Sequence, residues 1–177
     1  ITEVKKPKTL KKVKNSMEVV FSIPSGWHIK LGESINIDGV CSTVKGLNSD
    51  TFSVYYMPET LRKTSLSTLS KNHKFNIEKC ITLETLISGH LVYGHVDTIA
   101  KVSKVTQDQE STLLEFEIDK NFIRYIVYKG SVAVNGVSLT VVSVGNDTFS
   151  VSLIPFTKDN TNLGELAGGD TVNIEVD

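Results

Sequence analysis

Two side chains in this sequence have the chemistry of a reactive site, and each comes shortly after a glycine. Cys41 lies two residues after Gly39, and His95 directly follows Gly94. A cysteine thiolate is a strong nucleophile and proton acceptor, and a histidine can relay protons near neutral pH. The structural alternatives are a small buried core residue for Cys41 and a side chain that only packs or hydrogen bonds for His95.

The stretch around Cys41 occurs twice in the chain. The segment INIDGVCSTV returns as VAVNGVSLTV, at an offset of 97 residues that places Ser138 on Cys41. The alignment runs without gaps over residues 34–80 and 131–177, and 18 of its 47 pairs are identical. Two copies of one module are therefore predicted. A solenoid is excluded, because the period is too long and occurs only twice.

Each copy has the pattern of short β-strands joined by tight turns. The dipeptides Asp38-Gly39 and Asn135-Gly136 are flanked by alternating apolar residues. This is a strong hairpin signal, because a type I′ turn needs positive φ at both central residues. A second hairpin follows in each copy. Many short strands within about 90 residues predict a small closed barrel.

The repeat also suggests how the chain is organised. It divides the chain into an N-terminal unit of residues 1–86 and a C-terminal unit of residues 87–177. Residues 119–130 lie outside the strand pattern and are expected to hold a short helix with Asp119 as its N-cap and one apolar face, formed by Phe122, Ile123 and Ile126. The first copy is expected to begin a few residues later than the second.

Charge and composition argue against several classes of partner. The formal net charge is −1, which gives no electrostatic case for nucleic acid or an anionic membrane. No apolar run approaches the roughly 20 residues that span a bilayer. Cys41 and Cys80 do not form a disulfide framework, which favours a reducing setting, either the cytoplasm, which we expect, or the interior of an organelle. His90 and His95, in an expected strand, would face opposite sides, so no metal site is expected.

Five motifs in order resemble the riboflavin synthase family: GESINIDGVCSTV, PETLRKTSL, SGHLVYGHVDT, YIVYKGSVAVNGVSLTV and IPFTKDNTNLGEL with VNIEVD. Any one of them is a weak signal, but five in order on a duplicated scaffold are specific. The resemblance implies an all-β fold of tandem duplicated six-stranded Greek-key barrels with short helices. Each unit would then hold one lumazine-binding barrel.

The resemblance also implies a reaction. Two molecules of 6,7-dimethyl-8-ribityllumazine exchange a four-carbon unit, which gives riboflavin and 5-amino-6-ribitylaminouracil, without a metal or other cofactor. The family is usually a homotrimer, with the active site between the N-terminal barrel of one subunit and the C-terminal barrel of its neighbour. The sequence repeat then reflects a reaction that uses the same molecule twice.

A second function is compatible with the same resemblance. Lumazine proteins share the duplicated barrel but hold a lumazine or flavin as an optical antenna without catalysis. Those relatives tend to lose the Gly-His and Ser-Leu-Thr motifs of the second copy, which are intact here. The sequence therefore favours the enzyme.

By resemblance, three residues are expected to be catalytic. Cys41 would act as nucleophile or proton acceptor and His95 as a proton relay, while Ser34 would either assist Cys41 or only shape the turn. Lys129 would reach the neighbouring site or remain a solvated lysine. Strand-end segments would bind the ring and the ribityl chain, namely Ser42, Thr43, Tyr55, Tyr56, Met57, Pro58, Glu59, Thr60, Gly94, Val96, Ser138, Leu139, Thr140, Ser152, Leu153, Ile154, Pro155, Phe156 and Thr157.

Some of these assignments carry open alternatives. The hydroxyls of Thr60 and Thr157 bind ligand or only secure a turn. Ser42 stands where the family usually has leucine, and Phe156 where histidine or glutamate is common. Both of these departures would alter the pocket.

Overall fold

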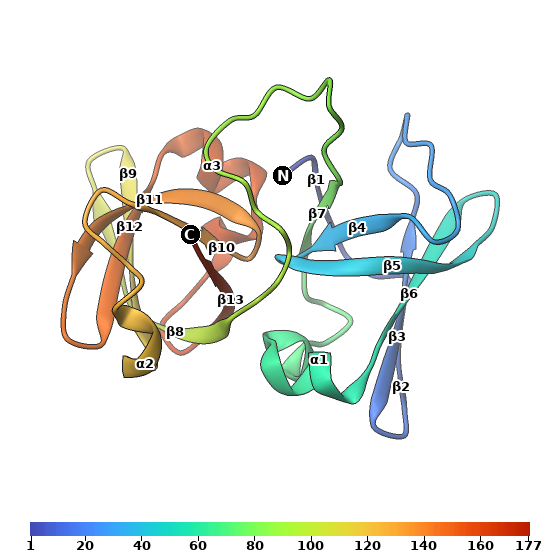
Figure 1. Ribbon diagram of the computed structural model, residues 1–177, viewed down its shortest axis with the longest axis horizontal. Helices are drawn as coiled ribbons and strands as arrows, with labels where there is room; N and C mark the ends of the chain where they lie inside the picture. Colours follow the sequence, from blue (N-terminus) through green and yellow to red (C-terminus); the bar gives the residue numbers. More distant parts are fainter.

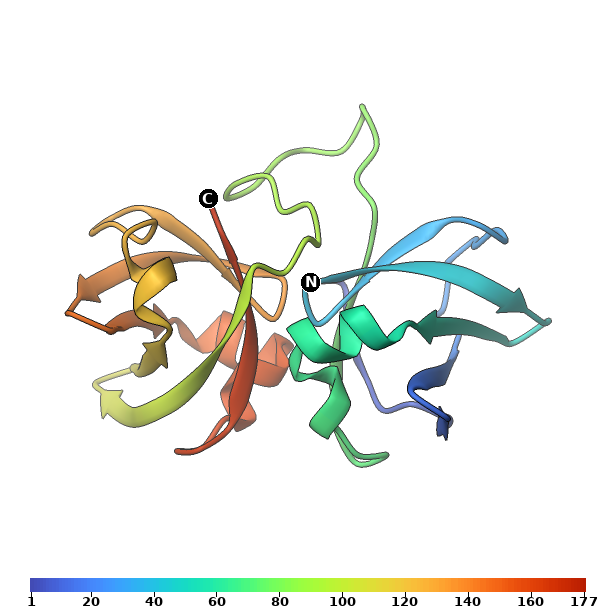
Figure 2. The same cartoon turned by 60° about the horizontal axis from the view of Figure 1, so that its bottom comes forward.

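The computed structural model describes residues 1–177 and consists of two barrel-like lobes side by side (Figure 1). Residues 80–97 run between the lobes and project from their junction, as the turned view also shows (Figure 2). The first lobe contains β1 (Glu3–Lys5), β2 (Thr9–Val13), β3 (Ser16–Ser22), β4 (Ser34–Ile37), β5 (Val40–Leu47), β6 (Thr51–Tyr56), α1 (Pro58–Lys63), the 3₁₀ helix η1 (Ser65–Thr68) and β7 (Phe75–Lys79).

The second lobe is a closed six-stranded barrel with the order β10-β11-β12-β9-β8-β13. Its elements are β8 (Thr98–Asp108), β9 (Ser111–Ile118), α2 (Lys120–Ile123), β10 (Ser131–Val134), β11 (Val137–Val144), β12 (Thr148–Leu153), α3 (Pro155–Asn160), the 3₁₀ helix η2 (Asn162–Glu165) and β13 (Thr171–Val176). The strands β10, β11 and β12 are joined by tight connections, and β13 returns to lie beside β10, which gives the strand order of a Greek key. The all-β class with short helices is confirmed.

The first lobe differs from the expected closed barrel at one point. Its sheet has the order β1-β7-β4-β5-β6-β3-β2, so β1 and β2 together take the place that β8 fills alone in the second lobe. The break falls at Pro7, which has no N–H to donate to a ladder. The corresponding part of β8 has a register shift between Val102 and Lys104. A local irregularity is thus common to both copies, and in the first copy the proline interrupts the strand completely.

Each lobe has its own hydrophobic core, built on a stacked aromatic pair. The ring centroids of Phe21 and Phe52 lie 5.5 Å apart, and those of Phe116 and Phe149 lie 5.2 Å apart. All four side chains are almost completely buried. Stacked pairs of this kind add to the stabilisation from burial itself. The repeat therefore extends from the sequence to the packing of the two cores.

The two tight turns have the predicted geometry and lie against each other. Asp38 and Gly39 have φ values of 47° and 80°, and Asn135 and Gly136 have 46° and 78°. A Cβ on Gly39 would lie 2.8 Å from the backbone nitrogen of Gly136, and a Cβ on Gly136 would lie 2.9 Å from the nitrogen of Gly39. Glycine is therefore required here both by conformation and by the close approach of the lobes.

Twin asparagines bond the two lobes around these turns. The side chain of Asn76 donates to the carbonyl oxygen of Asn135 at 3.0 Å, and that of Asn173 donates to the carbonyl oxygen of Asp38 at 2.8 Å. Both side chains are buried. Because the bonds are equivalent under the repeat, the two copies meet about an approximate two-fold axis, and their relative orientation is fixed by buried hydrogen bonds.

One position of this junction has an ionisable side chain in only one copy. Asp38 is buried, and its Oδ2 atom lies 2.7 Å from Nε2 of His73, whereas the equivalent residue in the second copy is Asn135. Burial raises the pKa of the Asp38 carboxyl above its ordinary value of 3.8, while the hydrogen bond and charge of His73 oppose the shift. The pKa of such a carboxyl is higher in the folded than in the unfolded protein. Its contribution to stability is complete below the pKa of the unfolded state and is lost as pH rises through the pKa of the folded state.

Asp38→Asn is therefore expected to gain stability relative to the parent as pH rises above about 4. The gain is about 1.4 kcal/mol for each unit by which the pKa of Asp38 differs between the folded and the unfolded protein. The asparagine keeps an acceptor oxygen for the backbone N–H of Asn76, and the same turn already accepts asparagine in the second copy. Urea unfolding of both proteins between pH 4 and 8 measures the difference. A difference in the free energy of unfolding between the two proteins that stays constant with pH would contradict this explanation.

Two further expectations concern the segments between strands. The short helix α2 forms, and the side chain of its N-cap Asp119 accepts from the backbone nitrogen of Asn121 at 2.8 Å. The expected strand around His90 and His95 is wrong, because no strand occurs between the end of β7 and the start of β8. Two glycines with positive φ, Gly89 and Gly94, interrupt that segment. None of the helices has the length and apolar character that crossing a membrane requires.

Candidate functional site

The outer face of the β4–β5 hairpin holds three of the expected site residues. In its antiparallel register Ser34 pairs with Thr43, and Asn36 pairs with Cys41. Side chains alternate between the two faces of a strand, so Cys41 and Thr43 are exposed while Ser42 between them is buried. Exposure excludes the alternative of a buried core cysteine for Cys41. Its thiol is accessible to a ligand on this face.

The second cysteine lies at the edge of the same hairpin. The thiol of Cys80 donates to the carbonyl oxygen of Ser34 at 3.1 Å. Partial burial, and then the proximity of Cys41 and Glu33, raises the pKa of the Cys80 thiol. Cys80 is therefore held in its protonated form, which is a poor nucleophile.

The segment that precedes β8 lies on the first lobe, although it belongs to the second copy. The backbone nitrogen of Cys41 donates to the carbonyl oxygen of Gly94 at 2.8 Å. A Cβ at Gly94 would come within 2.7 Å of that nitrogen, so only glycine permits the contact. Val96 then packs against the core of the first lobe. The residue after Gly94 is His95, which is exposed and stacks on Tyr93 with 6.2 Å between ring centroids.

Glu175 on β13 holds this segment, and sequence reasoning missed it. Its carboxylate accepts from the backbone nitrogens of Tyr93 at 2.6 Å, Gly94 at 2.8 Å and His95 at 3.0 Å. The residue is only 7% exposed. The available signal was the glutamate that both copies have in the motif NIE, at positions 78 and 175.

Ser42 and Tyr56, expected to bind substrate, point instead into the first lobe. Their hydroxyl oxygens lie 2.9 Å apart, and the Ser42 hydroxyl also donates to the carbonyl oxygen of Val40. Burial raises the pKa of Tyr56 far above its ordinary value. Leu139 and Leu153, both buried, fill the equivalent positions in the second lobe. The departure from the usual leucine at position 42 is therefore accommodated by a polar pair inside the barrel.

The segment after β6 presents several expected residues at the surface. Tyr55 lies under the ammonium group of Lys45, 4.2 Å from its ring centroid, and Met57 is exposed. Pro58 begins α1, and Glu59 forms an ion pair with Arg62.

The turn that follows is not secured by the hydroxyls that sequence analysis considered. The hydroxyl of Thr64 donates to the carbonyl oxygen of Thr60 at 2.7 Å, and that of Thr161 donates to the carbonyl oxygen of Thr157 at 2.7 Å. The bonds are the same in both copies. The side-chain hydroxyls of Thr60 and Thr157 are thus left for another partner.

The second hairpin offers an equivalent outer face with different contacts. Ser138 and Thr140 are half-buried and exposed, respectively. The hydroxyl of Ser138 lies 2.7 Å from Nδ1 of His90. Farther along the chain, Ser152 is half-buried, Ile154, Pro155 and Phe156 are exposed, and Thr157 is half-buried. Ser138 thus meets a histidine side chain where Cys41 meets the backbone of Gly94.

Lys129 has a backbone conformation that is unusual for its type. Its φ is +63°, and its equivalent in the first copy is Gly32, with φ +81°. Its backbone nitrogen donates to the carbonyl oxygen of Val141 at 3.0 Å, and its side chain is exposed near the ring of Tyr128. A lysine with positive φ, at a position where the first copy has glycine, is a reason to look for a function. It lies on the second lobe, and the fold does not bring it to the hairpin of Cys41.

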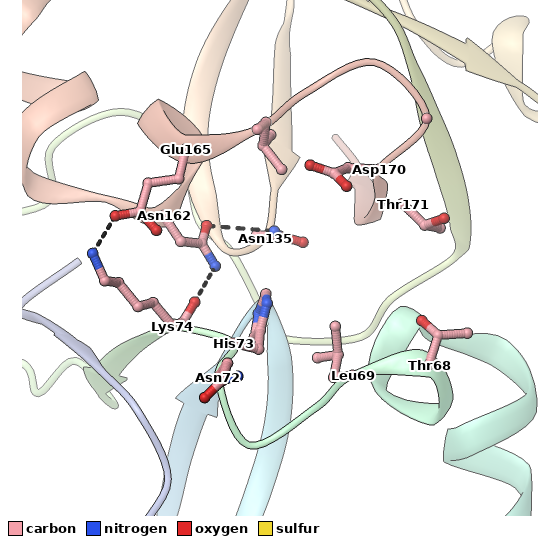
Figure 3. Close-up of a pocket in the computed structure, with 12 residues that line it drawn as sticks. Thr68, Leu69, Asn72, His73, Lys74, Asn135, Asn162, Glu165, Asp170 and Thr171 are labelled. Carbon is pink, nitrogen blue, oxygen red and sulfur yellow. Dashed lines mark hydrogen bonds and ion pairs between the residues drawn. The ribbon is translucent and has the colours of Figure 1, made fainter.

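A cavity of about 380 Å³ lies at the junction of the lobes and away from these hairpin faces. Figure 3 shows its polar lining, with Lys74 and Glu165 forming an ion pair at one side and Asn162 bonded to the carbonyl oxygen of Lys74. None of the expected site residues lines it. This cavity is therefore separate from the candidate site residues, of which Cys41 and Thr43 are exposed on the outer face of the first hairpin.

Comparison with known proteins identifies the repeated unit. Residues 1–80 and 93–177 match the lumazine binding domain family. The riboflavin synthase of Actinobacillus pleuropneumoniae is 38% identical over 149 residues, which cover 84% of this chain and 69% of that protein. That of Schizosaccharomyces pombe is 38% identical over 147 residues, covering 82% and 71%. That of Mycobacterium tuberculosis strain H37Rv is 39% identical over 150 residues, covering 82% and 75%.

Two solved structures have the same fold. LumP complexed with riboflavin has a TM-score of 0.91 at 20% identity, with 99% of this chain and 96% of that chain covered. LumP complexed with 6,7-dimethyl-8-(1'-D-ribityl) lumazine has a TM-score of 0.88 at 19% identity, with 98% and 95% covered. At these identities the likeness establishes the fold alone. The matched domains and the relatives at 38–39% identity establish that this chain belongs to the riboflavin synthase family.

Proposed function

We propose that this protein is a riboflavin synthase. It transfers a four-carbon unit between two molecules of 6,7-dimethyl-8-ribityllumazine, so that one leaves as riboflavin and the other as 5-amino-6-ribitylaminouracil. The observation that carries the proposal is the pair of equivalent hairpin faces, one with Cys41 and one with Ser138, in a chain about 38% identical to riboflavin synthases. Residues 1–86 and 87–177 are the two lumazine-binding units.

The main physical task of the protein is to hold two flat rings against each other. Alignment of two reactants can remove about 7–11 kcal/mol of the entropic barrier. The exposed backbone and hydroxyl groups of each hairpin offer hydrogen bonds to the polar edge of a ring. In the first unit these groups belong to Thr43 and residues 55–60, and in the second unit to Thr140 and residues 152–157. The hydroxyls of Thr60 and Thr157, which do not secure their turns, are suited to the ribityl chain.

The chemistry needs a group that accepts a proton or attacks the ring. Cys41 has this role, because its thiol is exposed on the first hairpin, whereas Ser138 offers a weaker nucleophile in the second. His95, presented beside Cys41 by Gly94, relays the proton from the acidic methyl group of the lumazine. Ser34, on the same face of the hairpin, supports the nucleophile.

The complete site forms between copies of the chain. Within one chain, Lys129 and the Ser138 hairpin belong to the second lobe, while Cys41 faces outward from the first. A neighbouring subunit can place its own second lobe on this face, as a homotrimer would. The setting is the cytoplasm, since both cysteines are free.

A mixture of two inactive variants tests the shared site. Cys41→Ser and Lys129→Gly are each expected to lower riboflavin formation strongly, and the mixed and reassembled proteins are expected to regain activity, because some interfaces then combine two intact halves. Lys129→Gly should fold normally: relief of the positive φ offsets the entropy of glycine, and stability should change by less than about 1 kcal/mol. No recovery on mixing would place the whole site within one chain.

The function itself is tested by adding 6,7-dimethyl-8-ribityllumazine and following the absorbance and fluorescence of riboflavin. Product formation without added metal or cofactor is the expected result. The alternative function, a non-catalytic lumazine- or flavin-binding antenna, would show tight binding and unchanged lumazine. The same experiment therefore separates the two candidates.

A further inference from the structure

The segment that carries Gly94 and His95 is anchored in one lobe and makes its contacts on the other. Its anchor is Glu175 on β13 of the second lobe, whose carboxylate accepts the backbone N–H groups of three consecutive residues at 2.6–3.0 Å. Hydrogen bonds to an ionised acceptor are roughly twice as strong as neutral ones. The carboxylate therefore fixes the orientation of this backbone.

Glu175 is connected to Cys41 through the two peptide groups that flank Gly94. The N–H of Gly94 donates to Oε2 of Glu175 at 2.8 Å, and the carbonyl oxygen of Gly94 accepts from the nitrogen of Cys41 at 2.8 Å. The N–H of His95 donates to the same Oε2 atom at 3.0 Å. One buried side chain thus controls where both His95 and Gly94 lie relative to Cys41.

The second hairpin has a different contact at the position equivalent to Cys41. Ser138, the equivalent of Cys41, contacts the side chain of His90 instead of a backbone carbonyl. The contacts that run from Glu175 through Gly94 therefore end at the cysteine hairpin and not at the serine hairpin.

We propose that Glu175 is a positioning residue for the four-carbon transfer, holding the Gly94–His95 segment so that the His95 imidazole and the Cys41 thiol face the same lumazine. The inference rests on the proposed function. Glu175 touches neither substrate nor reacting atoms and acts only through the backbone that it binds. Its loss lowers kcat more than it raises KM, because a displacement of about 1 Å in a reacting group costs on the order of 10²-fold in rate.

Three variants distinguish positioning from general stability. Glu175→Ala removes the acceptor for all three N–H groups. Glu175→Gln keeps an acceptor oxygen for Gly94 and His95 but turns an NH₂ group toward Tyr93. Glu78→Ala is the matched control, since it removes the equivalent glutamate from the other copy. Steady-state kinetics with 6,7-dimethyl-8-ribityllumazine give kcat and KM, and amide hydrogen exchange reports on residues 93–95.

We expect kcat to fall about 10²-fold in Glu175→Ala and about tenfold in Glu175→Gln, with KM changing less. Amide exchange at residues 93–95 and alkylation of Cys41 should accelerate in the same order. Glu78→Ala should match the parent in both measurements. If Glu175→Ala does not fold, the kcat and exchange of Glu175→Gln decide the question.

Two results would overturn the proposal. In the first, kcat stays within twofold of the parent while exchange at residues 93–95 accelerates, so that a loosened segment still supports the reaction. In the second, exchange at these residues stays slow in both Glu175 variants, so that Glu175 does not hold them. A parent that forms no riboflavin would instead refute the proposed function, and exchange and alkylation would still show whether Glu175 holds the segment on Cys41.

Discussion

Replacing Cys41 with serine is expected to lower kcat for riboflavin formation by roughly 10²- to 10⁴-fold, the range found when a group that transfers protons is removed. Serine keeps the size of the side chain and remains on the exposed face of the hairpin, but its hydroxyl is not ionised near neutral pH. Lumazine binding, followed by the change in its fluorescence, should stay within about tenfold of the parent. The loss is thus expected in the reaction step rather than in binding.

Cys80→Ser is the matched control for this prediction. Burial raises the pKa of the Cys80 thiol, and its Sγ donates to the carbonyl oxygen of Ser34, a bond that a serine hydroxyl can also make. This variant should keep most of the parent kcat. Equal losses in the two variants, or full activity in Cys41→Ser, would show that Cys41 has no special part in the reaction.

Asn173→Ala is expected to destabilise the protein by about 2–5 kcal/mol. The substitution leaves two buried groups without partners, the backbone N–H of Ser65 and the carbonyl oxygen of Asp38, which the Asn173 side chain bonds at 2.8 Å each. An unpaired buried group costs about 1–3 kcal/mol. Because these bonds join the two lobes, the lobes should also unfold less cooperatively. Urea unfolding followed by circular dichroism measures both effects.

Two other asparagine substitutions serve as comparisons for this prediction, one buried and one exposed. Asn76→Ala removes the equivalent bonds, to the carbonyl oxygen of Asn135 and from the nitrogen of Asn162, and should cost a similar amount. Asn146→Ala, at an exposed turn, should change stability by less than about 0.5 kcal/mol. Similar values for Asn173 and Asn146 would show that the buried bonds between the lobes contribute little.

Local structure could be predicted from the sequence wherever one short segment determines it. Asp38-Gly39 and Asn135-Gly136 have positive φ at both residues, as the type I′ turn requires. Asp119 caps its short helix. The offset of 97 residues predicted that the strands of residues 34–80 have counterparts in residues 131–177. The ring of the first lobe differs from that of the second, because a single proline at position 7 interrupts its ladder.

Contacts between the copies could not be predicted in the same way. The position of Gly94 in the sequence does not show that its carbonyl oxygen accepts a hydrogen bond from the backbone nitrogen of Cys41. The sequence around His95 suggested a strand instead of a segment that crosses to the other lobe. Glu175 resembles any polar residue at the end of a strand until its three N–H partners are seen. Ser42 was expected at a ligand, but the strand alternation places it inside the lobe against Tyr56.

The most direct test of the proposed reaction is its stoichiometry. A known amount of 6,7-dimethyl-8-ribityllumazine is incubated with the protein until absorbance is constant, and all species are quantified by chromatography. The account predicts that two lumazines are consumed for each riboflavin and each 5-amino-6-ribitylaminouracil formed. Lumazine that remains bound and unconsumed, or riboflavin that forms without an equal amount of the pyrimidine, would contradict it.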